Sequence, residues 1–589
     1  MSGRLRSICV SLSCISLLVL IFRMPVARPH ESVSHNARDK QKGLQAPDGR
    51  LEVEVTSWGP SQELIDKTTA ALPEQLQLKD HLQGTRYRLV AFELVESSKD
   101  ERLPPNAFRA IYYDYTNNQV VRAEGRFDNV ENLQVSMGND QPLPSNEEYA
   151  AAIAVLHNDP KIGPELTQNR LIANPAMPPV IYPDMATNGA GVERTINILL
   201  LPVSKGSYPT EVVGVNMVRN SVVHFPGGAP PSSKAAAAAC GIPSAGQATS
   251  SSGTPGQFEF VVRKDGVEYW RFIAIRPSAS SGPGDRSGIE LQSVKYKGKT
   301  LLKRMHTPIL NINYDGNACG PYRDWQWQEG MFRADGTDVP GTNGGVRDCG
   351  ATPATTALET GNDFGNFRGI AFYSVGNDEL VLVSEMNAGW YRYICEYRFN
   401  TNGTIRPRYG YGATSNSCVC FAHTHHVYWR FDFDIGGDGT TGAVNVVRPS
   451  RREFSWGSPY TIETRVQRTA RQNWLVQNPS TLDSYMIRPN SNDGTAAPGS
   501  FGKGDVWVLV YKANEISDRD TGGINIGSAA NIDGFMTSPE SLFNQDLVLW
   551  YGAHFYHDDG GNRPTASDTA PRVISGHHVH GPDLVPVRW

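Results

Sequence analysis

From residue 256 to Trp589 the sequence is a succession of short β-type runs separated by Gly, Asn, Asp and Pro. Almost no helical periodicity interrupts this pattern. Short strands joined by turn residues are typical of antiparallel sheets that pack face to face or close into a barrel. The sequence therefore predicts a large antiparallel β-sandwich over residues 256–589, and a fold class that is mainly β.

Two small α/β domains are predicted upstream of this region. Residues 50–140 alternate strand-like runs with polar turns and contain one helical candidate, SQELIDKTTAAL. Residues 141–228 open with Ser145 and Glu148 ahead of an apolar run of helical period, which predicts a capped helix followed by strands. Residues 229–255 are rich in Pro, Gly, Ser and Ala, and this composition predicts a linker. The chain is thus expected to be mainly β with α+β N-terminal domains.

The first 28 residues are typical of an exported protein. Two arginines precede an apolar run from Ile8 to Phe22, which is shorter than the about 20 apolar residues of a membrane span. We therefore expect a signal peptide and a secreted, extracellular protein. The cleavage site near Ala27 is poorly formed, so an uncleaved membrane anchor through residues 8–22 stays as the alternative. Export also permits disulfides among the six later cysteines and glycosylation at Asn402 in the run Asn-Gly-Thr.

The overall composition excludes one broad class of partner. The chain has 589 residues, 39% of them hydrophobic and 20% charged, which is ordinary for a globular protein with a large core. Its formal net charge is −5, and no long basic block is present. We therefore expect no nucleic acid partner.

Histidines within the sandwich region indicate a metal site. In the run FAHTHHVYWRFDFDI, His423 and His425 are one residue apart, so on a strand they project to the same face while His426 faces away. An H-x-H pair alone is a weak signal, but a later aromatic run, NQDLVLWYGAHFYH, ends at a third candidate ligand, His557. Three neutral imidazoles suit copper, zinc, nickel or iron, and an open position would let the ion meet O2 or water.

Two further features bear on this metal site. The rival for the third ligand is the C-terminal cluster His577, His578 and His580, but a His-rich tail near the surface is usually solvated, so His557 is preferred. Asp432 and Asp434 follow His425 on the other strand parity, and they could hold a second, harder cation on the opposite face.

At these segments the sequence resembles the copper amine oxidases. The run HTHHVYWRFDFDI is similar to the segment that supplies their first two copper histidines, and NQDLVLWYGAHFYH is similar to the segment that bears the third. The resemblance implies copper on His423, His425 and His557. It also implies a second cation, calcium, at a site whose residues are Asp432, Phe433, Asp434, Asp546 and Leu547. Homodimers are implied in the same way.

The family makes its redox cofactor, topaquinone, from one of its own tyrosines. The run LVLVSEMNAGWYRYICEYRFNTNGTI resembles the strand and turn around that tyrosine and places Tyr391 at the precursor position. Two neighbours depart from the family pattern: Trp390 stands where Asn is expected, and Arg392 replaces an acidic residue. A second partial match, SVGNDEL, has Asp378 at the tyrosine position; if that run is the true counterpart, the cofactor cannot form.

The resemblance also implies the remaining catalytic residues. GPYRDWQWQEG is similar to the segment that carries the general base, which gives Asp324 as the proton acceptor and Tyr322 as a gate. A carboxylate in a mostly apolar pocket has a raised pKa and can remove an α-proton near neutral pH. Tyr314, in NINYDGN, resembles the tyrosine that hydrogen-bonds the quinone oxygen. By residue type alone, Asp324 is equally well a turn residue after Pro321.

The expected function is a secreted oxidase that uses copper and topaquinone, in which the quinone built from Tyr391 would form a Schiff base with a primary amine and O2 would be the second substrate. The products would be an aldehyde, ammonia and hydrogen peroxide. The alternative is a non-catalytic metal-binding relative that keeps the fold but lacks the quinone.

Overall fold

The computed structural model describes the following residues: 49–95, 103–139, 141–176, 193–203, 208, 211–224, 240–242, 251–281, 286–312, 326, 328–362, 364–414, 418–420, 423–437, 442–452, 455–469, 472–496, 504–516, 532–557, 572–573 and 579–589. The predicted signal peptide or anchor lies outside these residues, as does most of the predicted linker. Among the described residues, no helix combines the length and the apolar character needed to cross a membrane.

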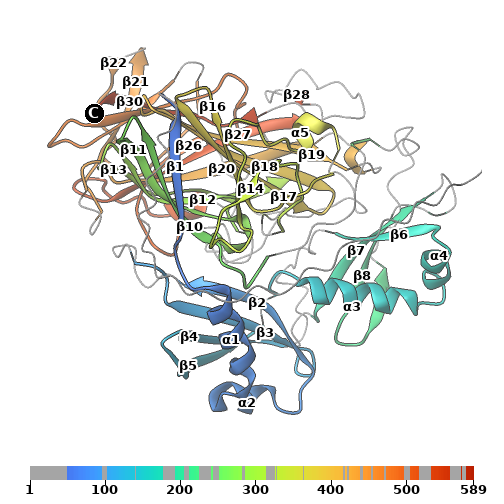
Figure 1. Cartoon of the computed structure of the whole chain (residues 1–589). Coiled ribbons are helices and arrows are strands. Elements are labelled where there is room, and N and C mark those ends of the chain that lie inside the picture. The colour runs from blue at the N-terminus through green and yellow to red at the C-terminus, as the bar shows by residue number, and fades with distance from the viewer. Residues whose placement is uncertain are drawn as a thin grey trace, which may run out of the picture. The chain divides into compact units, whose positions relative to one another are not determined.

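Two large sheets make up the C-terminal region (Figure 1). The first runs in the order β1-β10-β11-β12-β13-β20-β27-β26-β23, with β28 beside β27. Its strands are β1 (Leu51–Ser57), β10 (Gln257–Lys264), β11 (Val267–Ile275), β12 (Glu290–Tyr296), β13 (Lys299–Ile312), β20 (His423–Phe433), β23 (Thr464–Val466), β26 (Val506–Val510), β27 (Leu547–His557) and β28 (Arg572–Val573).

The second large sheet runs in the order β14-β15-β16-β17-β18-β19-β30-β25-β24-β21-β22, with β29 beside β19. Its strands are β14 (Thr337–Asp338), β15 (Val346–Asp348), β16 (Ile370–Val375), β17 (Glu379–Ala388), β18 (Tyr391–Asn400), β19 (Ile405–Ala413), β21 (Val446–Arg452), β22 (Ser455–Trp456), β24 (Trp474–Gln477), β25 (Ser484–Arg488), β29 (Val579–His580) and β30 (Asp583–Arg588).

The two sheets pack face to face through aromatic and aliphatic side chains. Phe272 of β11 stacks on Phe399 of β18 with ring centroids 4.3 Å apart, and Trp270 meets the same ring edge-on at 5.3 Å. Side chains from both sheets belong to one continuous core cluster. Alternate residues of β20, including Val427, enter this core because successive side chains of a strand face opposite ways. The predicted antiparallel sandwich is confirmed.

The predicted α/β modules have small sheets of their own. The first contains α1 (Gln62–Ala71), α2 (Leu76–Leu82) and a sheet of β2 (Tyr87–Val95), β3 (Ala107–Asp114), β4 (Gln119–Arg126) and β5 (Asn129–Gly138). The second contains α3 (Asn146–His157), α4 (Gly163–Thr167) and a sheet of β6 (Leu171–Pro175), β7 (Thr195–Pro202), β8 (Glu211–Asn216) and β9 (Ser221–His224).

Capping residues fix the starts of the two longer helices. Ser61 accepts a hydrogen bond from the backbone of Leu64 at the start of α1. At the start of α3, Ser145 and Glu148 form a reciprocal capping box, in which each side chain bonds the backbone of the other. Both helices thus begin where the sequence predicts.

Residues 51–57 differ from expectation, because β1 does not join the sheet of the first small module. It pairs with β10 of the large sheet along its full length, from Leu51 opposite Lys264 to Ser57 opposite Phe258. The short helical elements within and around the sandwich are α5 (Ala357–Thr360), η5 (Pro277–Ala279), η6 (Cys418–Cys420) and η8 (Ile532–Met536), while η1 (Leu72–Glu74) follows α1.

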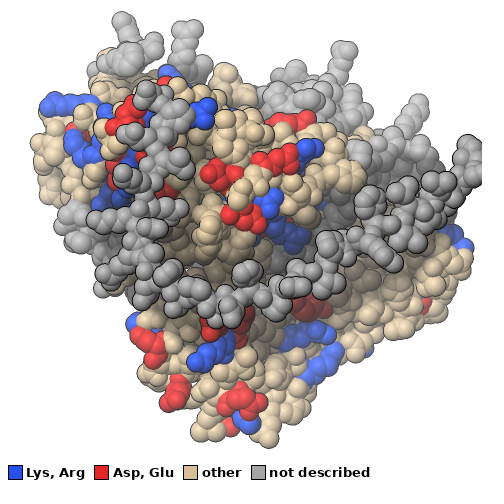
Figure 2. All heavy atoms as spheres, in the orientation of Figure 1, with Lys and Arg blue, Asp and Glu red and all other residues tan. Residues whose placement is uncertain are grey.

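Charge is mixed over the face of the molecule shown in Figure 2. Basic and acidic side chains of the described residues lie interspersed there, with neither sign forming a broad single field. Charged side chains of the described residues also form surface ion pairs, as in the contact of Arg263 with Glu54 at 2.9 Å.

Candidate metal centre

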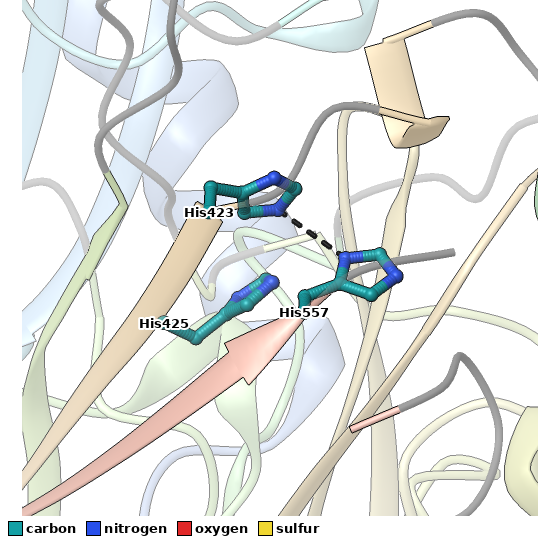
Figure 3. Close-up of side chains that lie close together, drawn as sticks. All are labelled: His423, His425 and His557. Carbon is teal, nitrogen blue, oxygen red and sulfur yellow. Dashed lines mark hydrogen bonds between the residues drawn. The ribbon is translucent and has the colours of Figure 1, made fainter. Parts of the chain in front are cut away.

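The three candidate histidines are brought together by two neighbouring strands. β20 and β27 pair antiparallel, with His423 directly opposite His557 and His425 opposite Phe555. His423 and His425 lie on the same face of β20, and all three imidazoles are buried. Figure 3 shows the three rings converging, two from β20 and one from the end of β27. The strand parity expected for the H-x-H pair is therefore present.

The imidazole nitrogens are close enough to share one ion. One nitrogen from each of the three histidines lies within 4.8 Å of the other two. Nε2 of His423 and Nδ1 of His557 are 3.3 Å apart, and the hydroxyl oxygen of Tyr391 lies 2.6 Å from the first and 2.8 Å from the second. Among the described residues this is the one group of three or more His, Cys, Asp or Glu that converges so closely.

His425 presents its remaining nitrogen without a protein partner. Its Nδ1 lies 3.0 Å from the hydroxyl of Tyr393, whereas its buried Nε2 makes no hydrogen bond within the described part of the chain. Burial holds the pKa of His425 well below its ordinary value, and the neighbouring imidazoles of His423 and His557 lower it further. A neutral imidazole with an unbonded nitrogen is a suitable metal ligand, and a metal-binding histidine normally has its other nitrogen oriented by a hydrogen bond.

Aromatic rings enclose the triad. Tyr411 stacks on His425 with centroids 4.1 Å apart, and Phe555 stacks on the same imidazole at 5.4 Å. The ring of Tyr391 meets His425 edge-on at 4.7 Å. These rings are almost fully buried, so the site is shielded from water on the sides they cover. Sequence reasoning missed Tyr393 and Tyr411; the Tyr-x-Tyr spacing that puts Tyr391 and Tyr393 on one strand face was the available signal.

Hydrogen bonds fix the charged group of Arg392, one of the two departures beside Tyr391, at an amide oxygen and two backbone carbonyls. The guanidinium of Arg392 donates hydrogen bonds to the side-chain oxygen of Asn387 and to the carbonyls of Gly389 and Tyr391. The carbonyl of Trp390 accepts hydrogen bonds from Thr414. Both side chains are buried, with Arg392 2% exposed. The positive charge therefore lies at the backbone turn that precedes β18.

The competing run SVGNDEL lies at the opposite end of the β17–β18 hairpin from Tyr391. In the β17–β18 pairing, Ala388 is opposite Tyr391, while Glu379, which follows Asp378, is opposite Asn400. Asp378 is exposed and bonds Lys264 at 2.7 Å. The structure thus brings Tyr391, and not Asp378, to the imidazoles.

The C-terminal histidine cluster does not supply a triad ligand from the part that is described. His580 is fully buried, and the expectation that this tail is solvated is wrong at that residue. The reason is that β29 pairs with β19 and the imidazole stacks on Phe555 at 4.1 Å. His577 and His578 lie outside the described residues.

The predicted second cation site lies at the far end of the same strands. Asp434 is fully buried, and burial raises its pKa to about 6, with the charges of Asp432 and Asp546 raising it further. One oxygen of Asp434 accepts a hydrogen bond from Ala443 at 2.5 Å, and the other has no partner within the described residues. The three carboxylates do not converge as the imidazoles do. Phe433 ends β20 and Leu547 begins β27, next to these acids. Calcium stays a prediction.

The remaining predicted catalytic residues, Asp324, Tyr322 and Tyr314, lie outside the described residues. Their positions relative to Tyr391 are therefore still predictions from the resemblance.

One disulfide lies beside β20, the strand that carries His423 and His425. It joins Cys240, within the predicted linker, to Cys420, three residues before His423. Cys349 and Cys395 are buried free thiols. The disulfides that export permits among the later cysteines include this one at Cys420; the side chain of Cys418 lies outside the described part.

The residues present fit a copper ion. Nε2 of His423, Nε2 of His425 and Nδ1 of His557 make a nitrogen donor set that suits copper, zinc, nickel or iron, and such an ion would bind the otherwise unpartnered Nε2 of His425. The nearby phenol of Tyr391 contacts the other two donors.

Solved amine oxidases share this fold at low sequence identity. The copper-containing benzylamine oxidase of Hansenula polymorpha superposes with a TM-score of 0.55 at 15% identity, over 90% of this chain and 97% of that one. The lysyl oxidase of Pichia pastoris gives 0.52 at 12% identity over 93% and 91%, and an amine oxidase of Aspergillus nidulans gives 0.50 at 14% over 92% and 89%. No protein-family model and no curated protein matches the sequence. The likeness is one of fold, and it extends over nearly the whole chain.

Proposed function

We propose that this chain is a divergent copper amine oxidase that converts a primary amine, O2 and water into an aldehyde, ammonia and hydrogen peroxide. One observation carries the proposal. The hydroxyl of Tyr391 lies 2.6 Å from Nε2 of His423 and 2.8 Å from Nδ1 of His557, in a chain whose fold is shared with amine oxidases. A tyrosine that is to be oxidised at a metal must lie next to that metal's ligands, and Tyr391 does so.

The residues that would hold the cofactors follow from the donor set. His423, His425 and His557 would bind copper, and Tyr391 would be the precursor of topaquinone. When bound, these groups supply the O2 chemistry and the electron sink that ordinary side chains lack. Calcium is proposed for the acidic residues Asp432, Asp434 and Asp546 at the far end of the strands.

The protein's own contribution is orientation and exclusion of water. Tyr393 orients the ring of His425 through its Nδ1, and the rings of Tyr411 and Phe555 stack against the imidazole and against each other. Hydrogen bonds and charges in such a dry, enclosed site act more strongly than in water. We assign Asp324 as the base that accepts the α-proton, with Tyr322 as gate and Tyr314 as the partner of the quinone oxygen; these assignments rest on the resemblance. Secretion, or anchoring through residues 8–22, and homodimerisation are proposed on the same basis.

The second candidate function is a metal-binding relative without the quinone. It is favoured by Trp390 and Arg392, which stand where the family has Asn and an acidic residue. Arg392 is tied to the backbone on either side of Trp390, through the carbonyls of Gly389 and Tyr391, so the turn beside the precursor has a different construction here.

Phenylhydrazine separates the two candidates. The purified chain is loaded with Cu²⁺ under O2 and treated with phenylhydrazine, and the peptide containing Tyr391 is then analysed by mass spectrometry. The amine oxidase proposal expects a coloured adduct on that peptide. An unmodified tyrosine mass in a protein that has bound one copper per triad would favour the non-catalytic relative.

A further inference from the structure

Four buried aromatic residues form a continuous path that leaves the metal centre and crosses the sandwich. Tyr393 of β18 packs on Tyr409 of β19 with centroids 5.8 Å apart, Tyr409 meets Trp429 of β20 at 6.3 Å, and Trp429 meets Tyr551 of β27 at 6.2 Å. All four side chains are at most 1% exposed. The path therefore begins in one large sheet and ends in the other.

The first ring of the path is joined directly to the triad. The hydroxyl of Tyr393 lies 3.0 Å from Nδ1 of His425, whose other nitrogen is the candidate metal donor. The path does not pass through Tyr391. An oxidising equivalent that arises at the metal centre can therefore reach Tyr393 through this hydrogen bond without oxidising Tyr391, the cofactor precursor.

The surroundings of the two later rings differ in a way that gives the path a direction. The indole N–H of Trp429 has no hydrogen-bond acceptor within the described residues, so an oxidised Trp429 has no adjacent base to take its proton. It would instead take an electron from Tyr551, the next ring of the path. The hydroxyl of Tyr551 is 2.5 Å from Oδ2 of Asp493. Loss of an electron from a phenol is strongly favoured when a base receives the proton at the same time.

Tyr551 is also held in a form that has a proton to release. Burial keeps the pKa of Tyr551 well above its ordinary value, and the charge of Asp493 raises it further, so the phenol is neutral. The guanidinium of Arg468 lies 4.9 Å from the centre of the same ring and disfavours a cationic radical. Both contacts favour a neutral tyrosyl radical with its proton on Asp493.

The end of the path lies beneath a surface turn. Asp493 is buried, but Ser491, two residues earlier in the chain, is exposed. Backbone contacts fix the acid in place, because its carboxylate accepts hydrogen bonds from Asn490 at 3.0 Å and from Gly581 at 2.8 Å. A soluble one-electron donor at this turn would be close to Tyr551 without entering the metal site.

We propose that Tyr393, Tyr409, Trp429 and Tyr551 form an electron-transfer path that carries oxidising equivalents from the metal centre to Tyr551. The inference rests on the proposed function, because the oxidant is hydrogen peroxide, the product of that reaction. In the balanced sequence one peroxide accepts two electrons, one from Tyr551 in each of two successive turns, and two protons from solvent, giving two waters; Asp493 releases to solvent the proton that it receives from Tyr551 in each turn. At Tyr551 the electron leaves through Trp429 and the proton moves to Asp493. A phenolic or enediol reductant at the surface returns a hydrogen atom to each radical.

The test uses copper-loaded full-length protein carrying Tyr391→Phe, which cannot form the quinone and so separates the path from amine oxidation. After brief exposure to hydrogen peroxide, samples are freeze-quenched for electron paramagnetic resonance, with ring-deuterated tyrosine identifying tyrosyl radicals. We expect a tyrosyl signal that Tyr551→Phe removes or reduces at least several-fold. Tyr485→Phe is the matched control, because its buried hydroxyl bonds the carbonyl of Gly403 at 2.9 Å, away from the path, and it should leave the signal unchanged.

Trp429→Phe supplies a second readout. By interrupting the path it should lower the Tyr551 signal and raise oxidation of the His423 and His425 peptide several-fold, as measured by mass spectrometry. A signal that persists unchanged in both Tyr551→Phe and Trp429→Phe would overturn the inference, as would histidine oxidation at the same rate with and without Trp429. Copper content is measured before peroxide is added; a protein without copper would refute the proposed function and this path together, whereas a copper-loaded protein without the expected radical refutes only the path.

Discussion

The hydroxyl oxygen of Tyr391 lies 2.6 Å from Nε2 of His423, although the two residues are 32 positions apart in the chain. One is at the start of β18 in one large sheet, and the other is at the start of β20 in the other sheet. The contact therefore depends on how the two sheets pack. It makes the phenol a neighbour of any ion held by the triad, and this is the geometric basis of the functional proposal.

Tyr391→Phe is expected to abolish the phenylhydrazine adduct while leaving metal binding in place. The substitution removes the hydroxyl but keeps the ring that meets His425 edge-on at 4.7 Å. The measurement compares adduct absorbance with copper content in the same sample. Tyr485→Phe, whose hydroxyl bonds a carbonyl elsewhere in the core, serves as the control and should keep the adduct. An adduct that survives in Tyr391→Phe would show that the quinone, if present, arises from another residue.

Tyr393→Phe is expected to weaken metal binding by about 10–100-fold, the usual cost of losing a hydrogen bond that orients a metal-binding histidine. The affected contact is the 3.0 Å bond between the Tyr393 hydroxyl and Nδ1 of His425. Titration of the metal-free protein with Cu²⁺ or Zn²⁺ against a competing chelator measures the change. Tyr397→Phe is a matched control on the same strand face, since its hydroxyl bonds the carbonyl of Ile289 at 3.2 Å. Equal affinities of the two variants for the metal would show that Tyr393 does not orient a metal-binding histidine.

Arg392→Glu is expected to destabilise the protein, although it restores an acidic residue at the position where the family has one. The guanidinium donates to three oxygens, those of Asn387, Gly389 and Tyr391, and a carboxylate cannot donate to any of them. Each buried acceptor left unpaired costs about 1–3 kcal/mol. Arg392→Lys, which keeps a cationic donor, should be milder. Thermal unfolding of the two variants decides the point, and a Glu variant as stable as the Lys variant would contradict it.

The sequence contained enough information to predict the sandwich and the imidazole triad. Strand alternation placed His423 and His425 on one face, and the aromatic run that ends at His557 identified the third ring. The placement of His423 and His425 on one face uses only the period of a β-strand, whereas the choice of His557 also rests on the resemblance to the copper amine oxidases. The helix start at Ser145 was predicted for a similarly local reason, since capping depends on residues within one turn.

Contacts that depend on sheet order could not be predicted. Nothing in residues 51–57 shows that β1 pairs with β10, more than 200 residues away in the chain. His580 was expected to be solvated because it belongs to a His-rich tail, whereas a two-residue strand carries it against Phe555. Disulfide pairing is equally non-local, and the sequence does not show that the partner of Cys240 is Cys420. These features follow from tertiary packing, which local patterns do not encode.

Native Cys349 is expected to resist alkylation at neutral pH. Burial raises the pKa of its thiol to about 11, and the carboxylate of Asp348 raises it further, so little reactive thiolate is present. The rate of modification by iodoacetamide should rise about tenfold for each pH unit up to that pKa, because the thiolate is the nucleophile. Labelling followed by mass spectrometry measures it. Cys240 and Cys420 should be labelled only after reduction, and fast labelling of native Cys349 at neutral pH would contradict its buried environment.

Glu329→Gln is expected to lower the stability of the sandwich by about 3–5 kcal/mol at neutral pH, because removing one partner of a buried ion pair leaves the other charge uncompensated. The carboxylate of Glu329 is fully buried and lies 2.5 Å from the guanidinium of Arg276, with the hydroxyl of Ser278 at 2.9 Å. Burial alone would raise the pKa of Glu329, but Arg276 and Ser278 outweigh it and hold the pKa below its ordinary value.

The sign of the pH dependence follows from that lowered pKa. A carboxyl group whose pKa is lower in the folded protein than in the unfolded chain binds fewer protons when folded, so its stabilising contribution is complete above the unfolded value and is lost as the pH falls through the folded one. The stability gap between wild type and Glu329→Gln should therefore stay constant from pH 8 to about pH 6 and shrink below about pH 4.5. Denaturant unfolding followed by tryptophan fluorescence across this range measures the gap. Glu54→Gln, which breaks a surface pair with Arg263, is the control and should change stability little at any of these pH values. A gap that widens on acidification would mean that Glu329 is protonated in the folded protein at neutral pH, and the ion pair with Arg276 would then have to be abandoned.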